Sequence, residues 1–143
     1  MSDPYRLRRF QTAQNESRTY EAAVSELRAG RKVSHWMWFI FPQISGLGRS
    51  PMSQTYAISS LAEAKAYLDD PILGLRLIEC TRVLTELEGR TAEQIFGSTD
   101  AMKLRSSMTL FARAASDNAL FQRVLDDYFG GATDESTERL LES

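Results

Sequence analysis

One run of apolar residues constrains the fold of this chain more than any other feature. Its members recur in alternating steps of four and three residues, a spacing that aligns them on one face of an α-helix. They are Leu73, Leu77, Cys80, Leu84 and Leu87. Asp70-Pro71 before the run is typical of a helix start, and Gly89 after it is typical of a helix end. We therefore expect a helix that opens at Asp70-Pro71 and ends at Gly89.

The remaining segments also favour helices. Capping-box patterns occur at Ser60-x-x-Glu63 and Thr91-x-x-Gln94, and Gly97 is expected to close a short helix. No segment sustains the two-residue alternation of a β-strand. The sequence predicts an all-α fold, a compact multihelical single domain over residues 1–143 with about seven to eight helices. A short hairpin near residues 43–58 is the alternative for the loop in that region.

Composition excludes several classes of protein. The net charge of -2 over 143 residues argues against general nucleic-acid binding, since no overall excess of cations is available to neutralise phosphates. The single cysteine, Cys80, rules out an internal disulfide and favours a reducing compartment. The chain begins without a signal-peptide pattern, and its longest apolar run, from Trp36 to Phe41, is too short to cross a membrane. We expect a cytoplasmic protein that does not bind membranes, and the oligomeric state stays open.

A second constraint lies in residues 33–62, where Arg49 is the single formal charge in a protein that is 25% charged. Such a segment is either buried or lines a pocket. Ser34 is expected to cap a short helix that Pro42 ends. Trp36 and Trp38 would diverge by about 200° on that helix. Both could pack in the core, or one could enter the core while the other flanks a pocket.

Catalytic candidates are few. His35 could act as a general acid or base, because its ordinary pKa of about 6.5 lies near neutrality. The alternative is a buried histidine that bonds the backbone and holds the aromatic run in place. Asp134 is the second acid–base candidate. One histidine and one cysteine make a metal site improbable, so we predict no metal and no cofactor.

Two polar stretches could bind an anion. The loop from Gly46 to Ser50 combines two glycines with arginine and serine, although a tight turn explains it equally well. The helix from Asp100 to Phe111 offers a lysine and hydroxyls, although its small residues could instead let another helix approach. The candidate ligand-binding residues are Trp36, Trp38, Gln43, Gly46, Gly48, Arg49, Ser50, Lys103, Ser106 and Ser107.

Long motifs across the chain resemble one known family. Besides the run from Ser34 through Gln43 and the Gly46 to Ser50 loop, they are Arg9-Phe10, Ala13-Gln14, Gly30-Arg31-Lys32, Tyr56-x-Ile58, Ile95-Phe96-Gly97, Asp100-x-x-Lys103-Leu104-x-Ser106-Ser107-Met108-Thr109-Leu110-Phe111 and Gly131-x-x-Asp134-x-x-Thr137. The chain resembles a bacterial family of unknown function, domain-of-unknown-function family 1810, whose members often carry the mistaken name calpastatin. The resemblance implies a compact multihelical domain and no established activity. Residues 15–18 depart from the pattern, where we expect a shorter link.

Three functions are compatible with these observations. The leading hypothesis is binding of a small anionic, nucleotide-like metabolite between residues 34–50 and 100–109. The first alternative is a non-catalytic protein-interaction module whose aromatic run is core. A weaker alternative is a hydrolase or transferase acting on ADP-ribose-type nucleotides.

Overall fold

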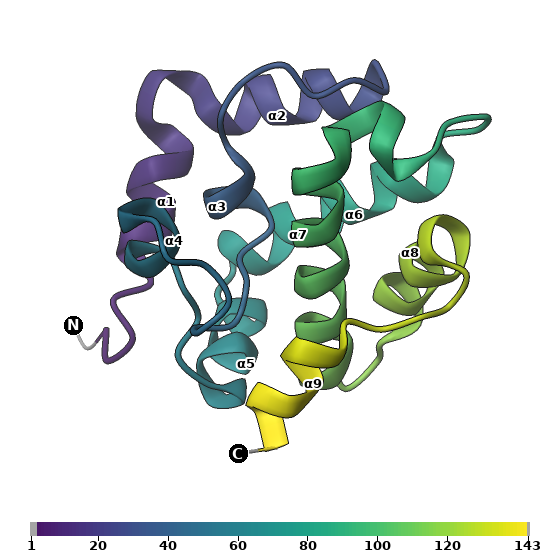
Figure 1. The fold of residues 1–143 in the computed structure, drawn as a ribbon. Helices are drawn as coiled ribbons and strands as arrows, with labels where there is room; N and C mark the ends of the chain where they lie inside the picture. Colours follow the sequence, from purple (N-terminus) through teal and green to yellow (C-terminus); the bar gives the residue numbers. More distant parts are fainter. Residues whose placement is uncertain (1–2, 143) are drawn as a thin grey trace.

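The computed structural model describes residues 3–142. In this range the chain forms helices and no β-strand, which confirms the predicted all-α class. The elements in chain order (Figure 1) are α1 (Arg8–Asn15), the 3-10 helix η1 (Glu16–Arg18), α2 (Thr19–Arg28), α3 (Met37–Ile40), α4 (Pro51–Thr55), α5 (Leu61–Asp69), α6 (Leu73–Glu86), α7 (Ala92–Ala114), α8 (Ala119–Phe129) and α9 (Glu135–Glu142).

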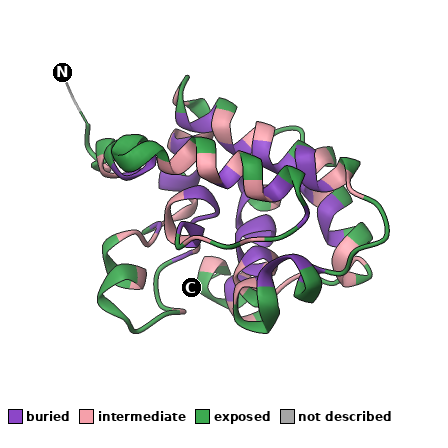
Figure 2. Ribbon diagram, turned by 90° about the horizontal axis from the view of Figure 1, so that it is seen from above, coloured by how far each residue is buried: buried purple, intermediate pink, exposed green. Residues whose placement is uncertain are grey.

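The long helix α7 runs through the middle of the molecule. It packs against α5, α8 and α9, while α6 packs against α2, α5 and α8 (Figure 1). Buried residues lie on the inward sides of the helices and exposed residues on their outward sides (Figure 2). None of the described helices combines the length and apolar composition that crossing a membrane requires.

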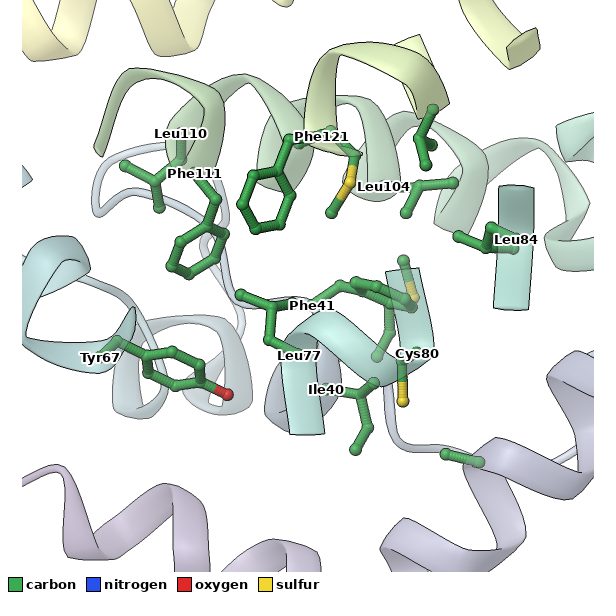
Figure 3. Close-up of a cluster of buried hydrophobic side chains, with 14 of the residues drawn as sticks. Ile40, Phe41, Tyr67, Leu77, Cys80, Leu84, Leu104, Leu110, Phe111 and Phe121 are labelled. Carbon is green, nitrogen blue, oxygen red and sulfur yellow. The ribbon is translucent and has the colours of Figure 1, made fainter. Parts of the chain in front are cut away.

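Side chains from α3, α5, α6, α7 and α8 meet in one apolar core (Figure 3). The predicted stripe of α6 contributes Leu77, Cys80 and Leu84, each no more than 1% exposed. Phe111 of α7 packs between two other rings, with ring centroids 5.4 Å from Tyr67 and 6.0 Å from Phe121. Burial raises the pKa of the Cys80 thiol to about 12, so this cysteine serves packing and supplies no thiolate.

Several predicted helix boundaries are confirmed. The capping box at Thr91 and Gln94 is complete, and the Ser60 hydroxyl accepts a hydrogen bond from the Glu63 backbone N–H at 3.1 Å. The Asp70 carboxylate accepts from the N–H groups of Ile72 and Leu73, although α6 begins at Leu73, after the predicted start at Asp70-Pro71, and ends at Glu86, before Gly89. Gly97, with φ of 81°, interrupts α7 where two helices were expected. Local sequence patterns therefore specify these boundaries.

Other local predictions are wrong. The hairpin near residues 43–58 is absent, because Ile44 and Ile58 form a single parallel bridge. The chain leaves this bridge, passes through α4 and returns in the same direction, whereas a hairpin needs antiparallel strands. The missed α4 has a clear signal, since Ser50 caps it and Pro51 stands at its first position. Ser34 does not cap α3, because its hydroxyl donates to Glu26 instead.

A close approach between α5 and α6 depends on Gly74. A Cβ atom at this position would lie 2.1 Å from the carbonyl oxygen of Leu68, which is backbone and cannot move aside alone. In most helices Gly→Ala stabilises by about 1 kcal/mol. Here we expect Gly74→Ala to lower the free energy of unfolding by about 1–3 kcal/mol, because the clash overpacks the contact. Urea denaturation measures this change.

Glu86→Ala is the matched control, since Glu86 is exposed on the same helix. It should change stability by no more than about 0.5 kcal/mol. A Gly74→Ala protein more stable than the natural chain would contradict the close approach.

Candidate functional site

The two tryptophans have different environments. Trp36 is 0% exposed, and its ring lies edge-on to Phe96 with centroids 6.4 Å apart. Trp38 is only partly buried and lines a cavity. The structure therefore matches the arrangement in which one tryptophan enters the core and the other flanks a pocket.

Trp36 is fixed by Glu26 of α2. The indole N–H donates to Glu26 Oε1 at 2.9 Å, and the backbone N–H groups of Val33 and Ser34 donate to the same oxygen at 2.7 and 2.8 Å. The Ser34 hydroxyl donates to Oε2. Burial alone would raise the pKa of the Glu26 carboxyl, but the hydrogen bonds from Ser34, Val33 and Trp36 lower it to about 2. The Glu26 carboxylate thus fixes the segment from Val33 to Trp36, which directly precedes α3.

A cavity of about 320 Å³ lies beside Trp38 and is called the Trp38 cavity below. Its lining comes from residues 38–57, so it combines α3, the following loop and α4. The lining residues are Trp38, Gln43, Ile44, Ser45, Gly46, Gly48, Ser53, Gln54, Tyr56 and Ala57. The volume is at the lower end of the roughly 300–1,000 Å³ typical of small-molecule sites.

Helix α7 reaches this region through Lys103. Its ammonium nitrogen lies 4.9 Å from the centroid of the Trp38 ring, within the range of a cation–π interaction. Asp100 pairs with Lys103 at 3.5 Å and more closely with Lys32, at 2.9 Å. Two lysines share one carboxylate, so the cluster has a net charge of +1. This excess charge lies against the tryptophan of the Trp38 cavity.

Two buried hydrogen-bonding groups, one on Trp38 and one on α7, are not satisfied within residues 3–142. The indole N–H of Trp38 and the hydroxyl of Ser107 are inaccessible, and neither has a hydrogen-bond partner within residues 3–142. Ser107 follows Lys103 by one helical turn, so both occupy one face of α7. Buried polar groups almost always have a partner, which makes these two candidates for contact with a ligand or an ordered water.

Backbone conformation at Gly46 and lack of space at Gly48 explain the glycines of the loop from Gly46 to Ser50. Gly46 has a backbone φ of 104°, which residues other than glycine rarely adopt. A Cβ at Gly48 would lie 2.5 Å from the Ser53 side chain, so this glycine lets the loop pass close over α4. Arg49 and Ser50 are exposed and do not line the cavity, although both directly follow Gly48. The tight-turn interpretation thus accounts for the glycines, and Arg49 remains available as an exposed cation.

Ser106 and Asp134 hold the C-terminal helix. The Ser106 hydroxyl donates to Asp134 Oδ2 at 3.2 Å, and the same oxygen accepts from the N–H and hydroxyl of Thr137 at 3.0 and 2.6 Å. The Asp134 N–H donates to Thr109 Oγ1 at 2.9 Å. This is the geometry of a helix N-cap, and it fastens the start of α9 to α7.

His35 is exposed and makes no hydrogen bond with any described residue. The alternative of a buried, hydrogen-bonded histidine is therefore wrong. Neither His35 nor Asp134 lines the Trp38 cavity. Within residues 3–142, no three His, Cys, Asp or Glu side chains gather in a way that could hold a metal ion.

Arg9 supports the cavity and was missed as a key residue, although Arg9-Phe10 is a family motif. Its guanidinium donates to the carbonyls of Thr55 and Ala57 at 2.9 and 2.8 Å, and to Glu63 Oε2 at 3.0 Å. Glu63 is 2% exposed, so the ion pair is buried. This contact ties α1 to the end of α4 and to α5, more than 45 residues away along the chain.

The chain matches one family model and one solved structure. A family model described as a protein of unknown function, DUF1810, matches residues 4–141. The crystal structure of the conserved hypothetical protein Rv1873 from Mycobacterium tuberculosis matches with a TM-score of 0.95. The two sequences are 52% identical, and the alignment covers 99% of each chain. The search of curated proteins gives no match.

Proposed function

We propose that this chain, which belongs to the DUF1810 family of proteins of unknown function, binds a small anionic metabolite at the Trp38 cavity. One observation carries the proposal. Trp38 lines a cavity of about 320 Å³, the Lys103 ammonium lies 4.9 Å from the centroid of its ring, and its buried indole N–H has no partner among the described residues. An unsatisfied buried donor costs about 1–3 kcal/mol, which a ligand acceptor would recover.

The charges around the cavity favour a ligand with negative charge. The cluster of Lys32, Asp100 and Lys103 has an excess of one positive charge, and Arg49 is a second cation next to a lining glycine. In the part of the chain that the structure describes, no carboxylate side chain lines the cavity to oppose an anion.

Binding is favoured over catalysis because the acid–base candidates lie elsewhere. Asp134 is engaged in the cap of α9, and no described residue forms a hydrogen bond that would orient His35. General acid–base chemistry needs a group within hydrogen-bonding reach of the substrate. The ADP-ribose hydrolase or transferase reading therefore draws no support from these two residues.

A thermal-shift screen with nucleotides, sugar phosphates and inorganic phosphate tests the proposal. A ligand at 100 times its Kd should stabilise the protein by about 2.7 kcal/mol, which raises Tm by several degrees. Trp38→Phe keeps a ring but removes the donor, and Lys103→Met keeps the chain length but removes the charge. We expect each to weaken binding about tenfold or more, the equivalent of one charge-assisted hydrogen bond.

Lys65→Met is the matched control, because Lys65 is exposed on α5 and does not line the Trp38 cavity. It should bind as the natural protein does. If Trp38→Phe and Lys103→Met also bind normally, the proposed site is wrong. A screen without any hit would favour the protein-interaction module instead.

A further inference from the structure

The walls of the Trp38 cavity carry no charge. Within residues 3–142, its lining has aromatic, carboxamide, hydroxyl and apolar side chains and two glycines, with no Lys, Arg, His, Asp or Glu. Burying an ionised group without a charged partner is costly. The part of a ligand that enters this cavity is therefore uncharged, and its anionic group lies outside, where Lys103 and Arg49 offer positive charge.

Two aromatic residues, Trp38 and Tyr56, line the cavity. Trp38 packs against Phe39 with centroids 6.1 Å apart, and Phe39 packs against Tyr56 at 4.7 Å. This row of rings places Trp38 and Tyr56 together in the lining. Bases of nucleic acids stack on such side chains with about 1–3 kcal/mol per base.

Gln43 supplies a free hydrogen-bonding edge. Gln43 lines the cavity and its carboxamide has no partner among the described residues, whereas the Gln54 amide nitrogen donates to the Arg49 carbonyl at 3.0 Å. A carboxamide has a donor beside an acceptor, and it can pair with the matching edge of a base in two hydrogen bonds. Trp38, whose buried indole N–H has no partner among the described residues, lines the same cavity.

We infer that the Trp38 cavity accepts the base of a nucleotide, and that the phosphate stays outside beside Lys103 or Arg49. This inference rests on the proposed function and names its ligand class. A sugar ring would use the aromatic walls too, but it lacks the planar edge with an adjacent donor and acceptor that pairs with Gln43.

Calorimetric titration with the four nucleoside monophosphates, ribose 5-phosphate and inorganic phosphate tests this inference on the full chain. At least one nucleoside monophosphate should bind about tenfold more tightly than ribose 5-phosphate, since stacking and base pairing add to the phosphate contact. Gln43→Met, of similar length, should weaken that nucleotide about tenfold and leave ribose 5-phosphate unchanged. If Gln43→Met does not fold, Gln43→Leu also removes the donor and the acceptor without adding charge, and it should weaken the nucleotide in the same way.

The outcomes separate the two proposals. If ribose 5-phosphate or inorganic phosphate binds as well as every nucleotide, and Lys103→Met weakens that binding, base recognition is wrong while the anion site stands. If no probe binds, both proposals fail. Unchanged nucleotide affinity in the folded Gln43 variants would also overturn base recognition.

Discussion

Replacing Arg9 with alanine is expected to lower the free energy of unfolding by about 3–5 kcal/mol, the effect of breaking a buried ion pair. The substitution leaves Glu63 buried without its cation and removes the donor to the carbonyls of Thr55 and Ala57. Arg9 also donates to the Tyr5 carbonyl at 2.6 Å. One side chain of α1 therefore bonds to the segment before α1, to the end of α4 and to α5. Chemical denaturation of the two proteins measures the loss.

The same helix provides the control. Arg8 neighbours Arg9 but is exposed, and Arg8→Ala should change stability by no more than about 0.5 kcal/mol. Combining Arg9→Met with Glu63→Gln should recover part of the loss, because no unpaired charge then remains buried. Equal stabilities of Arg9→Ala and Arg8→Ala would refute the role of this pair.

Glu26→Gln is expected to have the next largest effect, about 2 kcal/mol at neutral pH. A shift in pKa from 4.5 to about 2 corresponds to about 3.4 kcal/mol, at about 1.36 kcal/mol for each pKa unit. Solvent screening at this half-buried carboxylate reduces the effect to about 2 kcal/mol. The amide cannot accept the four hydrogen bonds from Val33, Ser34 and Trp36 with the same charge assistance.

The pH dependence has a definite sign. The folded pKa of Glu26 lies below the unfolded value, so its stabilisation is fully present above about pH 5. It is lost as pH falls through the range from about 5 to about 2, where the folded carboxylate becomes protonated. Over that range, the stability difference between the natural chain and Glu26→Gln should shrink toward zero.

Glu21→Gln, at an exposed position of the same helix, is the control and should show no such convergence. A constant difference across this pH range would argue against the anchoring role of Glu26.

Local patterns in the sequence predicted most helices. The stripe of α6, the capping box of α7 and the break at Gly97 depend on residues within a few positions of one another. Hydrophobic spacing and cap chemistry act over that range, which is why such elements can be recognised in a single sequence. The single-turn helix α4 was missed because Ser50-Pro51 was treated only as part of a glycine-rich loop.

Contacts between distant segments were the part that the sequence could not provide. Ser34 was expected to cap α3, but Glu26 from α2 takes its hydroxyl. Asp134 was considered as an acid or base, and it proves to cap α9 while bonding Ser106 of α7. The choice between these roles depends on which polar partner the tertiary fold brings within about 3 Å, and nothing in local spacing encodes that distance.

The candidate site also depends partly on local sequence features and partly on contacts between distant segments. The aromatic run from Trp36 to Pro42 is largely buried, as one alternative for this uncharged segment predicted, whereas residues 45–55 of the same segment are mostly exposed. The different environments of Trp36 and Trp38 depend on Glu26 and Lys103, which come from other helices. The Glu26 carboxylate accepts the hydrogen bond of the Trp36 indole, whereas the Trp38 indole lies beside the Lys103 ammonium.

The most direct test of the central claim compares the two indole N–H groups by nuclear magnetic resonance. The protein is titrated with the four nucleoside monophosphates, ribose 5-phosphate and inorganic phosphate, and Trp38→Phe identifies which indole signal belongs to Trp38. A ligand at the Trp38 cavity should shift the Trp38 indole signal and leave that of Trp36 in place, because Glu26 already holds the Trp36 donor. Lys103→Met should weaken the shift. A Trp38 indole signal that stays fixed with every probe would contradict the account.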